Sequence, residues 1–395
     1  MVSRIGAAWL AQPALQTMFG VLDGAKRRTR AVGGVVRDSL MAQARPASDI
    51  DLATELLPQD VMARAEAAGI ACHPTGLAHG TVTLVLDGLV AEVTTLRQDM
   101  ETDGRHAVVR FGTDWHQDAA RRDFTINALY CDQDGTIFDP LGGLADIAAR
   151  RVRFIGDPDQ RIAEDRLRVF RFFRFTASHG GERFDAAGLE ACYRASGRLG
   201  NLSAERVGTE MTRLLALPAC AATLAAMANC EVLALSPQSL ATLHRYEAST
   251  PHPALAGRLA LVMLDGLEAK ALQERWRLSN ALIEAAENLL RAVLLLEAGK
   301  LAEARYRLPD TVSEALVLVA ARGMADVDAL RTGLQEIGFG PLPIAGRDLL
   351  EMGYPPGRAL GQELARLEAL FIESNLTLSR AQLLGRARRP PQGSV

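Results

Sequence analysis

The chain has 395 residues, with 44 Lys and Arg against 47 Asp and Glu, and a formal net charge of −3. This length exceeds what one hydrophobic core holds, so roughly two to four domains are expected. The small net charge argues against a protein that coats nucleic acid without selectivity, although it permits a local basic groove.

The sequence carries no sign of a membrane or secretory protein. No stretch reaches about 18 uncharged apolar residues, so neither a transmembrane helix nor a membrane partner is expected. The N-terminus has no basic segment followed by an apolar run, which indicates no secretory signal. The five cysteines are scattered without a Cys-x-x-Cys pair, which predicts reduced thiols and a cytoplasmic location. The sequence does not specify an oligomeric state.

The first informative segment is a glycine turn. Apolar residues at helical spacing predict a helix over residues 13–23, and a short strand over residues 30–32 then leads into Gly33-Gly34. A glycine turn that opens a helix can hold a phosphate with its backbone N–H groups. Arg37, on the first turn of a helix predicted over residues 35–43, is placed to reach a phosphate oxygen; the alternative is an ordinary surface arginine.

The segment Asp49-Ile50-Asp51 follows at a short distance. In a strand over residues 48–53, Asp49 and Asp51 share one face while Ile50 faces the core. Two adjacent carboxylates repel each other unless a cation lies between them, and Mg²⁺ prefers oxygen ligands of this kind. The alternative is a solvated strand face, but a phosphate turn followed by an acidic strand favours nucleotide chemistry.

A helix and a hairpin are expected after the acidic strand. A helix is predicted over residues 58–68, and two alternating runs around Asp87-Gly88 predict a hairpin over residues 79–96. Glu92 on its second strand is either a third acidic neighbour of the metal site or an edge charge. Residues 97–120 are charged and without periodicity, which predicts a long loop.

The pair Arg121-Arg122 fits either phosphate binding or a solvated helix start, and a second hairpin is predicted over residues 130–138.

One continuous helix is then predicted around residues 156–175, where Asp165, Arg168, Arg171 and Arg174 recur every three residues and form a ridge. An Asp and an Arg side by side offer the acceptors and donors that read a base edge. The alternative is a salt-bridged surface helix. From about residue 185 onward the pattern is helical.

Four motifs in this order over residues 31–174 resemble those of class II tRNA nucleotidyltransferases, the family of CCA-adding enzymes and bacterial poly(A) polymerases: Gly33-Gly34-x-x-Arg37-Asp38, Asp49-x-Asp51, Arg121-Arg122-Asp123-Phe124-Thr125-Ile126-Asn127-Ala128 and Glu164-Asp165-x-x-Arg168-x-x-Arg171.

The resemblance implies an α+β fold, with a polymerase β-type nucleotidyltransferase head followed by an all-α neck, body and tail. It implies a catalytic head over residues 1–148, a neck for base recognition over 149–210, and a tRNA-binding body and tail over 211–395.

The resemblance also implies roles for single residues. Asp49 and Asp51 would be catalytic and would hold Mg²⁺. Gly34, Arg37 and Arg122 would hold the phosphates and sugar of the incoming nucleotide. Asp165 and Arg168 would read the base of CTP or ATP, and the pocket would be supported by Arg171 and Arg174.

The implied reaction is the addition of C, C and A to a tRNA 3′ end by two-metal phosphoryl transfer, with release of pyrophosphate. In this family a flexible loop after the first hairpin is tied to A addition, so the long segment 97–120 favours full CCA addition. A poly(A) polymerase of the same fold and a partial CC- or A-adding enzyme are the alternatives, as is an RNA-binding protein without catalysis.

Overall fold

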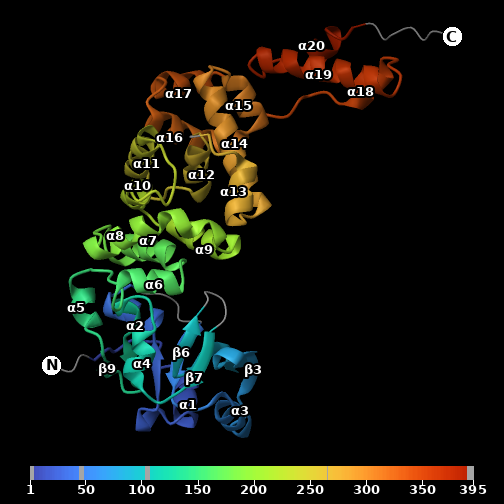
Figure 1. Cartoon of the computed structure of the whole chain (residues 1–395). Coiled ribbons are helices and arrows are strands. Elements are labelled where there is room, and N and C mark those ends of the chain that lie inside the picture. Colours follow the sequence, from blue (N-terminus) through green and yellow to red (C-terminus); the bar gives the residue numbers. More distant parts are fainter. Residues whose placement is uncertain (1–3, 44–48, 103–106, 265, 389–395) are drawn as a thin grey trace. The chain divides into compact units, whose positions relative to one another are not determined.

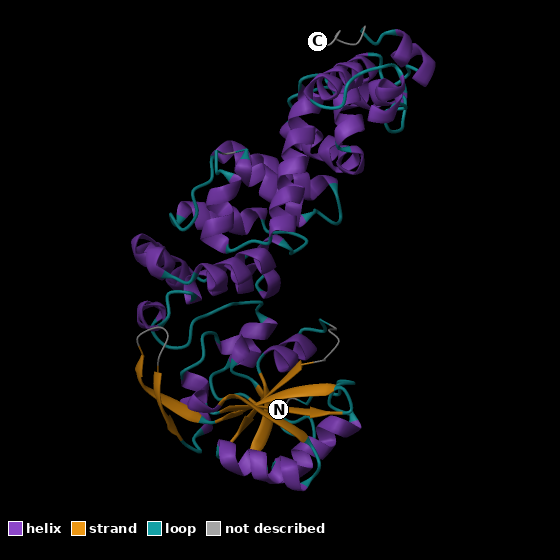
Figure 2. Ribbon diagram, turned by 90° about the vertical axis from the view of Figure 1, so that its right-hand side faces the viewer, coloured by secondary structure: helices purple, strands orange, loops and turns teal. Residues whose placement is uncertain are grey.

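The computed structural model describes residues 4–43, 49–102, 107–264 and 266–388. The chain divides into two compact units, residues 1–234 and 235–395 (Figure 1). All described strands belong to the first unit, and the described part of the second is helical (Figure 2). In the described part of the chain, no helix combines the length and the apolar character that crossing a membrane requires.

A mixed seven-stranded sheet forms the base of the first unit. Its strand order is β3-β4-β5-β2-β1-β8-β9, with β2 and β5 parallel and the other neighbours antiparallel. The strands are β1 (Thr29–Val32), β2 (Asp49–Thr54), β3 (Ala71–Gly76), β4 (Thr81–Leu86), β5 (Leu89–Thr95), β8 (Tyr130–Cys131) and β9 (Ile137–Phe138). The strand predicted over residues 48–53 and both predicted hairpins are confirmed.

One face of this sheet is covered by α1 (Pro13–Val21) and α3 (Pro58–Ala67). Ile50 and Leu52 of β2 point into the resulting apolar core, each 1% exposed, together with Phe19 of α1. Because side chains alternate along a strand, Asp51 must face the opposite side of the sheet. The alternation of β2 therefore decides which sheet face carries the acidic residue.

The other helices of the first unit are α2 (Gly34–Leu40), α4 (Trp115–Ala120), α5 (Gly143–Ala148), α6 (Pro158–Glu164), α7 (Arg168–His179), α8 (Ala186–Ala195), α9 (Ala204–Leu215) and α10 (Ala221–Asn229). The predicted boundary between residues 210 and 211 falls inside α9. The helix predicted over residues 35–43 ends at Leu40.

The prediction of a long loop over residues 97–120 is wrong. Strands β6 (Arg97–Thr102) and β7 (Ala107–Phe111) pair antiparallel in a separate two-stranded sheet, and α4 follows. A two-stranded ribbon outside the main sheet buries little surface, so its sequence need not alternate between apolar and polar residues. Residues 103–106 lie outside the described part.

The prediction of a single helix around residues 156–175 is also wrong. Asp165 has an extended backbone (φ −150°, ψ 103°) that separates α6 from α7. Its carboxylate accepts a hydrogen bond from the backbone N–H of Leu167 at 3.1 Å. Aspartate competes for backbone donors in this way, which is why it interrupts helices as well as beginning them.

The second unit contains α11 (Pro237–Ser249), α12 (Leu255–Met263), α13 (Ala269–Trp276), α14 (Asn280–Glu297), α15 (Leu301–Arg307), α16 (Val312–Arg322), α17 (Val327–Gln335), α18 (Gly346–Glu351), α19 (Arg358–Glu373) and α20 (Arg380–Gly385). The predicted helical character of this half is confirmed.

Candidate active site

The glycine turn and the acidic strand meet in the structure. Gly33 has φ +75°, a conformation that favours glycine, and a Cβ placed on it would lie 3.7 Å from Asp51 Oδ2. Asp51 is exposed on the sheet face opposite the α1–α3 core. The turn before α2 therefore lies beside an accessible carboxylate, as the sequence pattern predicts.

Other acidic groups are placed by the register of the sheet. Asp49 is the first residue of β2, and its side chain lies outside what the structure describes. Glu92 of β5 is paired in register with Asp51, and it is exposed. Neighbouring residues of a parallel pair project from the same sheet face, so Glu92 accompanies Asp51. No cluster of three metal-ligating side chains occurs among the described residues.

Arg37 is buried beneath this face, with 5% of its surface exposed. Its Nε donates to Asp38 Oδ1 at 2.8 Å, and its Nη1 donates to Asn127 Oδ1 at 2.6 Å. Asn127 in turn donates to Asp123 Oδ1 at 2.9 Å. In this arrangement the guanidinium braces α2 against the segment that follows α4.

Arg122 follows the end of α4 and is held by Asp118. Its Nη2 donates to Asp118 Oδ2 at 3.1 Å, while the hydroxyl of Tyr130 donates to the same oxygen at 2.8 Å. Asp118 is 1% exposed. Burial alone would raise its pKa, but the charges of Arg122 and Arg121 outweigh burial and hold the pKa below its usual range.

Asp165 and Arg168 lie at the junction of α6 and α7. The guanidinium of Arg168 donates to Glu164 Oε2 at 2.7 Å and to the carbonyl of Arg121 at 3.1 Å. Asp165 Oδ2 accepts from Arg206 of α9 at 2.6 Å. The backbone N–H of Arg168 donates to the carbonyl of Asp165 at 3.0 Å, so the two residues are adjacent, and the Arg168 side chain contacts the end of α4.

Arg171 and Arg174 point toward a buried carboxylate on α9. Arg171 donates to Asp123 Oδ2 at 2.7 Å, and Glu210 lies 3.4 Å from Arg171 and 2.5 Å from Arg174. Glu210 is 4% exposed. These contacts join both arginines of α7 to Glu210 of α9.

Sequence reasoning missed Glu210 and Arg206. Both lie on α9, whose sequence shows only an amphipathic helix and no motif. A buried glutamate among apolar neighbours (Val207, Met211 and Leu214) was the available signal, because such a charge requires a cationic partner.

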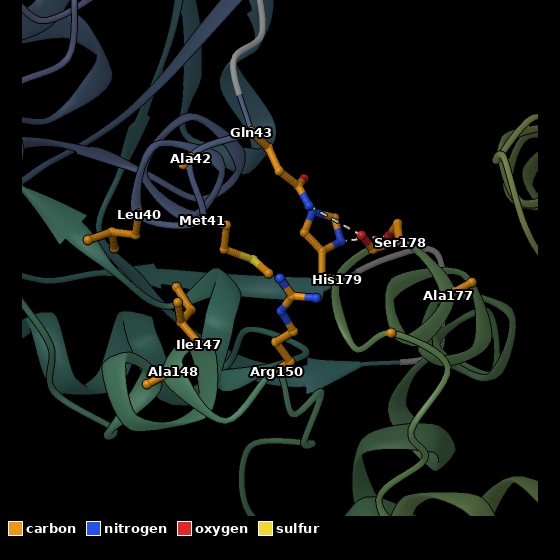
Figure 3. Close-up of a pocket in the computed structure, with 11 residues that line it drawn as sticks. Leu40, Met41, Ala42, Gln43, Ile147, Ala148, Arg150, Ala177, Ser178 and His179 are labelled. Carbon is orange, nitrogen blue, oxygen red and sulfur yellow. Dashed lines mark hydrogen bonds between the residues drawn. The ribbon is translucent and has the colours of Figure 1, made fainter.

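A cavity of about 360 Å³ lies elsewhere in this unit, where α2 ends at Leu40 (Figure 3). It is lined by residues 40–43, by α5 and by the end of α7 around His179. Asp51 and Arg168 are not among its lining residues.

Comparison with known proteins agrees with this architecture. Residues 29–153 match the family described as the Poly A polymerase head domain. The mitochondrial CCA tRNA nucleotidyltransferase 1 of Danio rerio is 31% identical over 378 residues, which cover 90% of this chain and 86% of that protein. The CCA-adding enzyme of Limosilactobacillus fermentum is 32% identical over 367 residues, which cover 87% of this chain and 88% of that enzyme.

Solved structures show the same fold. The Bacillus stearothermophilus CCA-adding enzyme in complex with CTP matches with a TM-score of 0.75 and 27% identity, over 95% of this chain and 96% of that one. The Thermotoga maritima CCA-adding enzyme complexed with tRNA shares the fold with a TM-score of 0.68 at 17% identity. These matches confirm the predicted fold class. With more than 30% identity across most of both sequences, the chain belongs to the family of CCA-adding tRNA nucleotidyltransferases.

Proposed function

We propose that this protein adds C, C and A to the 3′ end of tRNA from CTP and ATP. The observation that carries the proposal is the exposed Asp51 carboxylate beside the Gly33 turn, on the sheet face opposite the α1–α3 core. Family membership supports the same activity, because relatives that match over most of their length are named as CCA-adding enzymes.

Nucleotidyltransferases of this family typically use divalent metal ions. We assign Mg²⁺ to Asp49 and Asp51, since carboxylate oxygens are its preferred protein ligands. The exposed Asp51 fits this role, and Glu92 is positioned by register to join it. Bound ions would stabilise the charge that develops on the attacking and leaving oxygens.

The remaining residues are assigned either to the phosphates and sugar of the nucleotide or to its base. Gly34 and Arg122 would hold the phosphates and sugar, with Arg37 bracing the turn from below through Asn127. Asp165 would accept from the amino group of the base, and Arg168 would donate to its ring nitrogen. Arg171 and Arg174 would support that pair through Asp123 and Glu210.

In the proposed reaction the tRNA 3′-hydroxyl attacks the α-phosphate in line and pyrophosphate leaves. The chain contributes mainly by positioning these groups and by stabilising charge, so its carboxylates need no unusual basicity.

The division of labour along the chain is part of the proposal. The catalytic head comprises residues 1–148, the base-recognising neck 149–210, and the tRNA-binding body and tail 211–395. The solved complexes with CTP and with tRNA support these partners. The cytoplasmic location inferred from the cysteines stays a prediction.

An extension assay separates the rival activities. Purified protein and Mg²⁺ are given a tRNA transcript that ends at the discriminator base, with CTP alone, ATP alone or both. Addition of three nucleotides that needs both substrates and then stops supports the proposal. A long ladder with ATP alone identifies a poly(A) polymerase, a stop after two Cs identifies a CC-adding enzyme, and no extension favours an RNA-binding protein.

A further inference from the structure

His179 is a buried histidine outside every motif that suggested the function. It is the last residue of α7, and only 3% of its surface is exposed. Its Nε2 lies 3.1 Å from Asp38 Oδ1, and its Nδ1 lies 2.6 Å from Ser178 Oγ. The ring therefore joins the end of α7 to α2, the helix that follows the Gly33 turn.

The Asp38 carboxylate decides which ring nitrogen of His179 carries a proton. Burial is the main cause that lowers the pKa of His179, and the charge of Arg37 lowers it further, which favours a neutral ring. Because Nε2 faces a carboxylate, a ring proton belongs on Nε2. The Ser178 hydroxyl lies 2.6 Å from Nδ1 and also donates to the carbonyl of Arg174 at 2.9 Å. His179 is thus a directed donor to Asp38.

Asp38 connects His179 to Arg37. Its Oδ1 accepts from His179 and also from Arg37 Nε at 2.8 Å, and Arg37 continues to Asn127. Burial would raise the pKa of Asp38, but the hydrogen bond from His179 and the charge of Arg37 outweigh it and keep the carboxyl ionised. A second link runs in parallel, since Gln43 Nε2 donates to the carbonyl of Ser178 at 3.4 Å (Figure 3).

A short helix depends on such anchors. Helix α2 has only seven residues, too few to be stable without tertiary contacts. Val36 anchors it in the apolar core, and the indole of Trp9 donates to Ser39 Oγ at 2.8 Å. Helix α7, whose first residue is Arg168, supplies two further contacts: His179 with Asp38, and the ring of Phe175, whose centroid lies 5.0 Å from the guanidinium carbon of Arg37.

We propose that His179 is a positioning residue that holds α2, through Asp38 and Arg37, so that the Gly33 turn is correctly placed beside Asp51. This inference rests on the proposed function. The turn would act on the phosphates, which CTP and ATP share, so the effect of His179 is the same for both nucleotides. The nucleotide preference itself belongs to Asp165 and Arg168 and is independent of His179.

The test measures kcat and KM for CTP on tRNA lacking CCA and for ATP on tRNA ending in CC. His179→Ala is expected to lower kcat/KM by about tenfold to a hundredfold for both nucleotides, the effect of losing a hydrogen bond to a charged group. His179→Gln is expected to retain most activity, because its amide nitrogen is as many bonds from Cβ as Nε2 is. His73→Gln is the matched control, an exposed histidine on edge strand β3.

The cavity beside His179 allows a second measurement, the recovery of activity when imidazole is added. Imidazole added to His179→Ala can enter the space of about 360 Å³ that the ring lines, and it is expected to restore part of the lost rate. Where His179→Ala does not fold, His179→Gln and His179→Asn are compared instead. The asparagine stops short of Asp38, so it should lose activity while the glutamine keeps it.

Several results would overturn the proposal: unchanged kinetics in His179→Ala, equal activity of the glutamine and asparagine variants, or a loss confined to one nucleotide. A wild-type protein that extends no tRNA refutes the proposed function instead. The positioning role is then decided by calorimetric binding of Mg-CTP and Mg-ATP to wild type and His179→Gln or His179→Asn. Binding that is absent, or equal in all three, overturns the positioning role as well.

Discussion

Asp51 and Asp165 are carboxylates with different parts in the proposed chemistry, and their surroundings differ. Asp51 is exposed beside Gly33. Both carboxylate oxygens of Asp165 already accept hydrogen bonds, one from Leu167 N and one from Arg206. A base that approaches Asp165 must share these oxygens with Arg206, whose contact holds the carboxylate in one orientation.

Asp165→Ala is expected to blur the choice between CTP and ATP before it destroys chemistry. The variant loses the acceptor for the amino group of the base, so discrimination should fall by about tenfold to a hundredfold, the effect of one good base-edge contact. The measurement is the ratio of kcat/KM for the correct and incorrect nucleotide at each step of CCA synthesis.

Asp159→Ala is the control for this variant. Asp159 lies on α6 in an exposed ion pair with Arg194, so its loss should leave the selectivity of the enzyme unchanged. Unaltered selectivity in Asp165→Ala would remove Asp165 from base recognition.

At this scale the sequence revealed residue types but not their partners. The spacing of Asp49 and Asp51 predicted that they share a face opposite Ile50, because the period of a strand is two, and Asp51 does lie opposite the buried Ile50. Glu210 is 39 residues from Arg171 and 36 from Arg174, so only the packing of α9 against α7 brings them together. The sequence near Glu210 indicates that this residue needs a cationic partner, but it does not indicate which arginines those partners are.

The contact between α7 and α9 depends on buried charge. Glu210→Ala would leave Arg174 and the partly buried Arg171 without their shared carboxylate. Breaking a buried ion pair from one side costs about 3–5 kcal/mol, so the free energy of unfolding should fall by roughly that amount. Urea unfolding followed by circular dichroism measures the change.

Glu190→Ala provides the comparison, because Glu190 is an exposed residue of α8 whose side chain is 73% accessible. Its removal should change the free energy of unfolding by less than about 0.5 kcal/mol. Equal stability of the two variants would show that Glu210 does not hold the arginines in place.

The β6–β7 hairpin is the element for which the family resemblance predicts a role in adding the third nucleotide. Within the described part of the chain β6 and β7 pair only with each other, so deleting part of residues 99–112 should spare the main sheet. The family resemblance links this segment to A addition, so the shortened enzyme should stop after CC. Sequencing the products resolves this, and CTP addition serves as the internal control. Normal A addition by a folded deletion variant would contradict the assignment.

Elements with strong local signals were predictable and the others were not. The Asp87-Gly88 hairpin and α14 have turn residues and apolar periodicity that hold without tertiary context. Strands β6 and β7 have neither, since they stand outside the main sheet. The break between α6 and α7 depends on the Asp165 carboxylate bonding to Leu167 N, a choice that the threefold spacing of charges concealed.

For the whole molecule, the chemistry-bearing motifs all lie within the first compact unit, residues 1–234. The helical second unit shows no motif of this kind in its sequence, so its proposed role in tRNA binding rests on family membership. The sequence indicated more than one domain from length alone. It could not locate the division after Ala234, because the helical pattern runs through both sides of it.

The most direct test of the central claim compares wild type with Asp51→Asn on tRNA lacking CCA, with CTP, ATP and Mg²⁺. Wild type should add three nucleotides and stop. Asp51→Asn should bind tRNA at least as well, because it loses a charge that repels phosphates, yet its transfer rate should fall by about 10²–10³ or more. Asp87→Asn, the same change in an exposed hairpin turn, should behave as wild type. Retained transfer in Asp51→Asn would contradict the account.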